Sequence, residues 1–199
     1  MTGSQRQKQK QATRQNIIAM ALQQYGENGF LKTRTADIAH ASKVSHGTIF
    51  AHFPTQEELI VSVIEEFGNR ISARLHELTY NTSGIVDLLS AHIQGLLEYE
   101  AFYTRLVIEG RLLPKDARNT FILIQSTISF YLGQVAEREM EEGKIATLPI
   151  HMIFNSWTGL LHYYLINSDL FAPGESVLLR YGDEILNFYM ELLAPKNID

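Results

Sequence analysis

Residues 44–59 read VSHGTIFAHFPTQEEL, and this stretch decides the fold of the N-terminal part of the chain. It combines rings, hydroxyl groups and a glycine with no charge before the acidic pair near its end. Ser45 is suited to cap a short helix over residues 45–52, because its side chain can accept a backbone N–H. Pro54 ends that helix, since proline has no N–H to donate. We therefore predict a short, weakly charged helix here, followed by a longer one that runs to about residue 79.

Two more short helices are predicted upstream. Over residues 13–25 the apolar side chains recur at helical spacing, and two glycines follow to end the helix. A second helix is expected over residues 34–41, with Thr33 or Thr35 supplying the capping hydroxyl. Three short helices, with about four residues between the second and third, are typical of a helix-turn-helix. Such a unit presents its last helix to the major groove of DNA.

Charge is distributed unevenly along the 199 residues, whose formal net charge is −5. Residues 1–56 hold seven lysines and arginines against two acids, whereas residues 57–199 hold ten against twenty. A basic N-terminal part on an acidic body indicates a polyanionic partner for the basic part alone. Arg6, Lys8 and Lys10 precede the first predicted helix, either as a solvated tail or as an arm in the minor groove.

The side chains of the helix over residues 45–52 are expected to serve two purposes. Ile49 and Phe53, four residues apart, can pack onto the two preceding helices. The remaining side chains would face DNA, where small polar groups read bases and nearby cations hold phosphates. The predicted DNA-binding residues are Arg34, Thr35, Lys43, Ser45, His46, Gly47, Thr48, Phe50, His52 and Gln56.

The same segment resembles a known family. The stretch TRTADIAHASKVSHGTIFAHFPTQEEL, preceded by ATRQNIIAMALQQYGENGF, is similar to the DNA-binding domain of the TetR family of bacterial transcriptional regulators. The resemblance covers roughly residues 13–60. It implies a dimer that binds a palindromic operator, with the remaining helices forming a ligand pocket and a dimer interface.

Four positions depart from the pattern that is usual in that family. Lys43 stands in the turn where the family usually has glycine, so either a left-handed lysine costs roughly 1 kcal/mol or the turn has another conformation. Phe50 replaces a tyrosine and Gln56 a lysine, which weakens two phosphate contacts. Arg34 replaces a threonine and, like Lys43, adds a cation nearby. We expect operator binding to be retained with altered contacts.

The chain beyond residue 80 is predicted to remain helical, which makes the protein all-α. Helices are expected over residues 84–101, 102–112, 115–142, 149–167 and 174–193. We assign residues 1–54 to a helix-turn-helix DNA-binding domain with a basic N-terminal tail. Residues 55–199 are assigned to a larger helical ligand-binding and dimerisation domain.

Several of these later helices are apolar beyond one face yet carry isolated polar or ring side chains. An apolar cavity with a few convergent polar groups is the usual form of a small-molecule site, although each residue alone could be a satisfied core residue. The predicted ligand-binding residues are Tyr99, Tyr103, Gln125, Ser129, Asn155, Trp157, Thr158 and His162. The composition indicates a hydrophobic or aromatic effector, or a lipophilic cation held by rings.

The last two helices carry apolar stripes that would form a four-helix interface with a second copy, as in the family. The predicted dimer residues are Leu160, Leu161, Tyr164, Leu178, Leu179, Gly182, Ile185 and Tyr189. Gly182 in mid-helix costs roughly 1 kcal/mol relative to alanine, and a close helix crossing would explain its presence.

Other features of the sequence exclude several classes of protein. The chain has no cysteine, and no motif of a catalytic nucleophile, phosphate loop or metalloprotease is present, so we predict no enzyme, no metal and no cofactor. No apolar run reaches the length of a membrane span, and the polar start is no secretory signal, so we predict a cytoplasmic protein. The predicted function is a ligand-responsive repressor that binds its operator as a homodimer. The alternative is a helical interaction module that has lost DNA binding.

Overall fold

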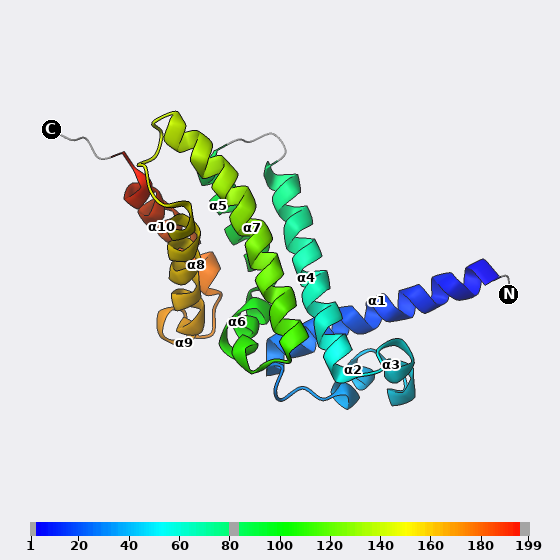
Figure 1. Cartoon of the computed structure of the whole chain (residues 1–199). Coiled ribbons are helices and arrows are strands. Elements are labelled where there is room, and N and C mark those ends of the chain that lie inside the picture. The colour runs from blue at the N-terminus through cyan, green and yellow to red at the C-terminus, as the bar shows by residue number, and fades with distance from the viewer. Residues whose placement is uncertain (1–2, 80–83, 196–199) are drawn as a thin grey trace. The chain divides into compact units, whose positions relative to one another are not determined.

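The computed structural model describes residues 3–79 and 84–195, which form helices joined by short loops (Figure 1). The helices are α1 (Gly3–Asn28), α2 (Thr35–Ala41), α3 (His46–His52), α4 (Gln56–Thr79), α5 (Ile85–Leu97), α6 (Glu100–Glu109), α7 (Lys115–Glu141), α8 (Ile150–Ile166), α9 (Ser168–Phe171) and α10 (Val177–Leu193), with a 3-10 turn η1 (Gly110–Leu112). Because these residues contain no strand, the predicted all-α class is confirmed. Among them, no helix is both long and apolar enough to cross a membrane.

Most helix bounds fall within a few residues of the sequence prediction, but α1 does not. It begins at Gly3, about ten residues before its predicted start, and therefore includes the cations that were expected to lie in a tail. Gly29 follows α1 with a φ of 84°, a left-handed conformation that glycine adopts without strain. The turn η1 falls at the end of the helix predicted over residues 102–112, and the short α9 was not predicted.

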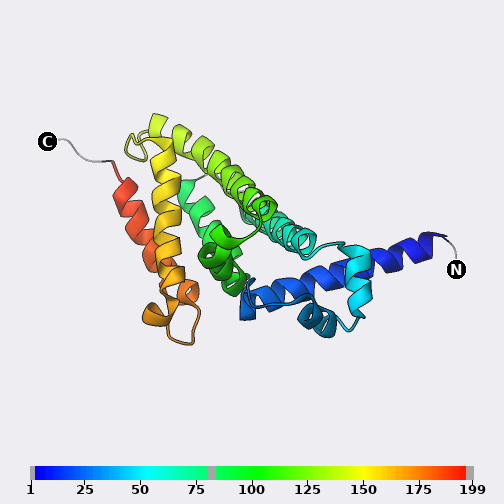
Figure 2. The same ribbon diagram turned by 60° about the horizontal axis from the view of Figure 1, so that its bottom comes forward.

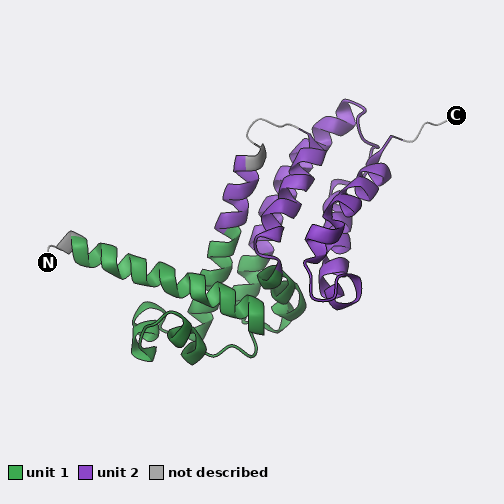
Figure 3. Ribbon diagram, turned by 180° about the vertical axis from the view of Figure 1, so that it is seen from behind, with its two compact units in different colours: residues 1–68, 101–121 green, residues 69–100, 122–199 purple. Residues whose placement is uncertain are grey.

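The chain divides into two compact units (Figure 3). Unit 1 comprises residues 1–68 and 101–121, and unit 2 comprises residues 69–100 and 122–199. The division falls within α4 and α7, so α6 is grouped with the N-terminal helices. The functional boundary after residue 54 stays a prediction, since compactness follows packing and not function.

Aromatic packing explains why α6 belongs to unit 1. The ring of Phe102 on α6 lies 5.4 Å from that of Phe30 and 5.2 Å from that of Phe67. Tyr25 stacks on Phe30 at 4.7 Å. A Cβ atom on Gly26 would lie 3.1 Å from the backbone nitrogen of Phe102, so glycine lets α1 approach α6 closely. Burial of each ring stabilises this core by about 1.5–3 kcal/mol.

The helix-turn-helix is held by a second part of the unit 1 core. Ile49 and Phe53 are buried, as predicted, and Ile38 of α2 is buried as well. The capping of α2 differs from the prediction. Its N-cap is Arg34, whose backbone N–H donates to the Asp37 carboxylate at 2.8 Å. Thr33 is instead buried, and its hydroxyl donates to the Gly29 carbonyl at 2.6 Å.

Unit 2 is built around α10, which packs on α5 and α8; Figure 2 shows α8 and α10 side by side. A Cβ atom on Gly182 would lie 2.9 Å from Cγ2 of Ile93, so the close crossing expected at Gly182 is made with α5 of the same chain. The Glu100 carboxylate caps the start of α10, where it accepts from the backbone N–H of Val177 at 2.8 Å and of Leu178 at 3.2 Å. Local hydrogen bonding and intrachain packing therefore fix the position of α10 in unit 2.

Candidate DNA-binding surface and small-molecule grooves

The start of α3 is fixed by Ser45, as the sequence predicts. Its Oγ accepts from the backbone N–H of Thr48 at 3.1 Å and lies 2.8 Å from the Thr48 hydroxyl oxygen. The cap satisfies one of the unpaired N–H groups at the helix start, and it also orients the Thr48 hydroxyl.

The turn between α2 and α3 contains the left-handed residue expected from the sequence. Lys43 has a φ of 56°, the positive φ that disfavours any residue with a Cβ. The turn is closed by a hydrogen bond from the Val44 N–H to the Ala39 carbonyl at 3.0 Å. Asn16 of α1 donates its side-chain amide to the Ser42 carbonyl at 2.9 Å. The turn therefore keeps its geometry despite the lysine, and the exposed cation lies directly before α3.

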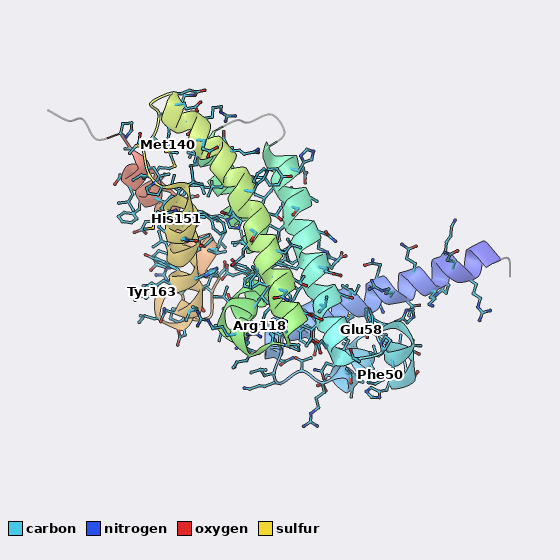
Figure 4. The ribbon with its side chains drawn as sticks, viewed as in Figure 1. Phe50, Glu58, Arg118, Met140, His151 and Tyr163 are labelled. Atoms are coloured by element: carbon cyan, nitrogen blue, oxygen red, sulfur yellow. The ribbon has the colours of Figure 1, made fainter. Side chains whose placement is uncertain are left out.

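His46 connects the two helices across the turn. Its Nε2 lies 2.9 Å from the Thr35 hydroxyl oxygen, and its ring meets that of Phe50 edge-on at 4.9 Å. Phe50 is 41% exposed. Figure 4 labels Phe50 on α3 and Glu58 on α4. The side chains of Thr35, His46 and Phe50 form one partly exposed set on the solvent side of α2 and α3.

Gly47 leaves open space beside the first turn of α3. A Cβ atom added there would meet only the Ser45 Oγ, at 3.8 Å. The absence of a side chain is thus not required by packing within the chain.

His52 lies at the C-terminal end of α3. Burial and, to a lesser extent, the positive charges of Lys10 and Arg14 lower the pKa of its imidazole. Arg14 itself lies over the Phe53 ring at 4.8 Å and donates to the Ser62 hydroxyl at 3.1 Å. The basic face of α1 is therefore close to this end of α3.

The predicted DNA-binding residues all fall in unit 1, at the start of α2, in the turn, on α3 and at the start of α4. Arg34 and Lys43 are exposed and available to a polyanion. Gln56 is more restricted, because its amide donates to the Thr33 carbonyl at 3.2 Å. Whether these residues contact DNA stays a prediction, but their geometry matches that of a reading helix flanked by phosphate-binding cations.

Comparisons with known proteins bear on this surface. Residues 17–63 match the family described as bacterial regulatory proteins, tetR family. The chain is also 30% identical over 148 residues to the HTH-type transcriptional regulator UidR of Escherichia coli (strain K12), which covers 70% of this chain and 72% of UidR. The chain belongs to the TetR family.

Two further TetR-family proteins show which parts are shared. The HTH-type transcriptional repressor Rv3405c of Mycobacterium tuberculosis is 37% identical over 60 residues, which cover 30% of this chain and 32% of Rv3405c. The similarity to that relative thus spans about a third of its length. A TetR-family transcriptional regulator from Agrobacterium tumefaciens has a crystal structure that matches with a TM-score of 0.78 at 18% identity, over 93% of this chain and 99% of that one. The TetR fold therefore extends over nearly the whole chain.

Two grooves of ligand size lie within unit 2. The first, of about 560 Å³, lies between α7 and α8 and is lined by three of the predicted ligand residues, Gln125, Ser129 and Asn155. Its other lining residues include Phe130, Phe154 and Glu137. Both the volume and the mixture of apolar and polar groups are within the range of small-molecule sites.

The second groove, of about 450 Å³, lies between α4, α5 and α7. Its apolar residues are Leu75, Leu88, Ile128 and Val135, and its polar residues include His76, Tyr131, Gln134 and Arg138. This groove was not predicted from the sequence. A usable signal was the presence of His76 and Arg138 late in two long helices, but only the tertiary structure shows that these helices face each other here.

Three other predicted ligand residues have structural partners within the chain. Trp157 is fully buried and donates to Nδ1 of His92 at 3.0 Å, and the buried Thr158 hydroxyl donates to the Phe154 carbonyl at 2.9 Å. Tyr103 is buried in unit 1, where it stacks on the Phe67 ring at 5.7 Å. Each is explained by the core and lines neither groove.

The remaining two, Tyr99 and His162, line neither groove either. The Tyr99 ring lies 5.8 Å from the Arg70 guanidinium. Burial lowers the pKa of His162 to about 4. Burial, with a smaller contribution from the charge of His162, also lowers the pKa of His92 to about 4. Both imidazoles are therefore neutral at pH 7, as suits the interior of unit 2.

Most of the stripe assigned to a dimer interface is core of the chain itself. The buried members are Leu161, Leu178, Gly182, Ile185 and Tyr189. These side chains have no surface to offer a second copy, because packing within unit 2 covers them. Leu160 and Tyr164 are partly exposed, and Leu179 is 76% exposed. Other large apolar residues are exposed on the same two helices: Met152, Tyr163 and Ile166 on α8, and Phe188 and Leu192 on α10.

Proposed function

We propose that this chain is a transcriptional repressor that binds a two-fold symmetric DNA operator as a homodimer and releases it when a small molecule binds to unit 2. The observation that carries the proposal is the exposed face of α3, with its capped start, its side-chain-free position at Gly47 and its ordered His46 and Thr48. A helix of this kind fits the major groove, whose base edges offer donors, acceptors and thymine methyl groups.

The contacts on that face divide by chemistry. His46 and Thr48 carry small polar groups suited to base edges, and Gly47 permits a close approach. Arg34 and Lys43 are exposed cations suited to phosphates. Phe50 has no hydroxyl to reach a phosphate, so we assign its ring to positioning His46 and to apolar contact with DNA.

The dimer surface is proposed to be the exposed apolar face of α8 and α10, not the buried stripe. Its residues are Met152, Tyr163, Ile166, Phe188 and Leu192, whereas Leu179 lies about 180° around α10 from Phe188 and is left outside this face. Large apolar side chains gathered on adjacent helices mark a protein interface. Pairing this face with its copy buries them in a four-helix contact and presents two α3 helices to DNA.

The two grooves of unit 2 support an effector site. Both α4 and α7 contain residues of unit 2 that line the second groove, and both helices continue into unit 1. A ligand that prefers one arrangement of these helices shifts the population of the DNA-binding form by no more than that preference.

Selection of bound duplexes from a random DNA pool tests the proposal. We expect a two-fold symmetric consensus whose affinity falls steeply with salt, because each phosphate contact releases counterions. A helical interaction module would enrich no consensus, and that result would reject the assignment.

A further inference from the structure

The N-terminal half of α1 is a cationic helix with no assigned role. Residues 5–12 are exposed, and the first acid of the chain is Glu27. Figures 1 and 2 both show this part of α1 projecting past α3 within unit 1. In the described residues, no carboxylate pairs with the cations of this segment.

Three of its four cations share one face. Arg6, Lys10 and Arg14 are spaced four residues apart, which places them in line along a helix. Lys8 lies on roughly the opposite face at 100° per residue. The segment therefore has a basic face and, at Lys8, an internal control of equal charge and similar position along the helix.

Arg14 and Lys10 show where the basic face points. The Arg14 guanidinium lies over the Phe53 ring, directly after α3, and donates to Ser62 of α4. The charges of Lys10 and Arg14 also act on His52, the last residue of α3. The basic face is therefore continuous with the C-terminal end of the helix that we assign to base reading.

We propose that Arg6 and Lys10 bind the phosphates of duplex DNA that flanks the bases read by α3. This inference rests on the proposed function and lengthens its binding site. Eight residues of helix span about 12 Å, so the face reaches roughly three or four base pairs at 3.4 Å each. Because the helix is already ordered, binding does not have to order a flexible tail.

The test compares two variants of the full chain on the selected duplex. Arg6→Gln with Lys10→Gln removes the proposed contacts, and Lys8→Gln is the matched control; glutamine preserves helix propensity. Affinity is measured over a salt series by fluorescence anisotropy. We expect the double variant to lower the slope of log K against log salt by up to roughly 3.6 for a dimer, at about 0.9 per phosphate, with no change in base preference. The Lys8 variant should leave the slope unchanged.

Duplex length gives a second readout. Removing four base pairs from each flank should weaken the wild-type chain but not the double variant. Equal slopes for the double variant and for Lys8→Gln, with no effect of flank length, would overturn the inference while leaving the proposed function intact. Failure of the wild-type chain to bind any duplex would instead reject the proposed function, and this inference with it.

Discussion

The hydroxyl oxygen of Thr35 in the first turn of α2 lies 2.9 Å from Nε2 of His46 in the first turn of α3. This contact crosses the turn and, together with the edge of the Phe50 ring, holds the imidazole in place before any partner binds. A side chain ordered in advance loses less conformational entropy on binding. The relationship therefore supports His46 as a base-reading residue.

Base reading and phosphate binding predict different effects of mutation. His46→Ala or Thr48→Ala should change base preference at specific positions, with about 1–3 kcal/mol lost on the preferred sequence. Arg34→Ala should lower affinity for every sequence by a similar factor. Binding to a panel of single-base variants of the consensus measures both effects. Uniform losses from all three variants would count against α3 as the reader.

Lys43 combines an unfavourable backbone conformation with a useful charge. Lys43→Gly should raise the free energy of unfolding by about 1 kcal/mol, because glycine tolerates a φ of 56°. The same change should weaken DNA binding and reduce its salt dependence, since a cation is lost. Urea unfolding and a salt series measure the two effects. Lys43→Asn, which removes the charge but tolerates this conformation less well than glycine, is the control. A less stable glycine variant would contradict the strain.

Gly47 is a second position at which one substitution should raise stability and weaken DNA binding. Gly47→Ala should stabilise the chain by up to about 1 kcal/mol, because the added Cβ meets only the Ser45 Oγ at 3.8 Å and alanine favours helix. DNA affinity should fall, because that Cβ would occupy the space needed for close approach. Thermal unfolding and anisotropy on one sample test both parts. Unchanged affinity would show that this position does not face DNA.

The buried imidazole of His92 makes stability depend on pH. Its pKa is about 4 in the folded chain and ordinarily 6.5, so the unfolded chain binds a proton that the folded chain does not between these values. Stability is therefore complete above about pH 6.5 and is lost as pH falls toward 4, by about 1.4 kcal/mol per pH unit. His92→Asn, which keeps an acceptor for Trp157, should reduce this slope. The measurement is the free energy of unfolding in urea at pH 7 and at pH 5. Equal values at the two pH values would contradict the burial of a neutral ring.

The proposed dimer surface predicts where a charge disrupts assembly. Phe188→Glu on α10 should shift the chain toward monomer, because the side chain is 51% exposed on the proposed interface. Leu112→Glu on η1, at 69% exposure outside that face, is the matched control and should leave the assembly unchanged. Light scattering after size exclusion measures the mass. A dimeric Phe188→Glu chain would show that the interface lies on another face.

How far the sequence predicts this protein differs from element to element. The helices over residues 34–79 follow from spacing, the Ser45 cap and Pro54, all of which are local, although the cap of α2 was predicted wrongly. The start of α1 was missed because its glutamines, lysines and arginines favour helix without any apolar periodicity. An apolar stripe does not reveal which chain covers it, so Leu161 and Leu179 could not be told apart before the structure. The convergence of His76 and Arg138 likewise depends on how distant helices pack.

The central claim, that two symmetric copies of α3 enter successive grooves on one side of DNA, is tested most directly by changing half-site spacing. Affinity is measured for the selected duplex and for the same duplex with five base pairs inserted at its centre, which rotates one half-site by about half a helical turn. We predict a large loss of affinity for the inserted duplex, with recovery toward the original value when ten base pairs are inserted. Equal affinity for the original and five-base-pair duplexes would contradict the account.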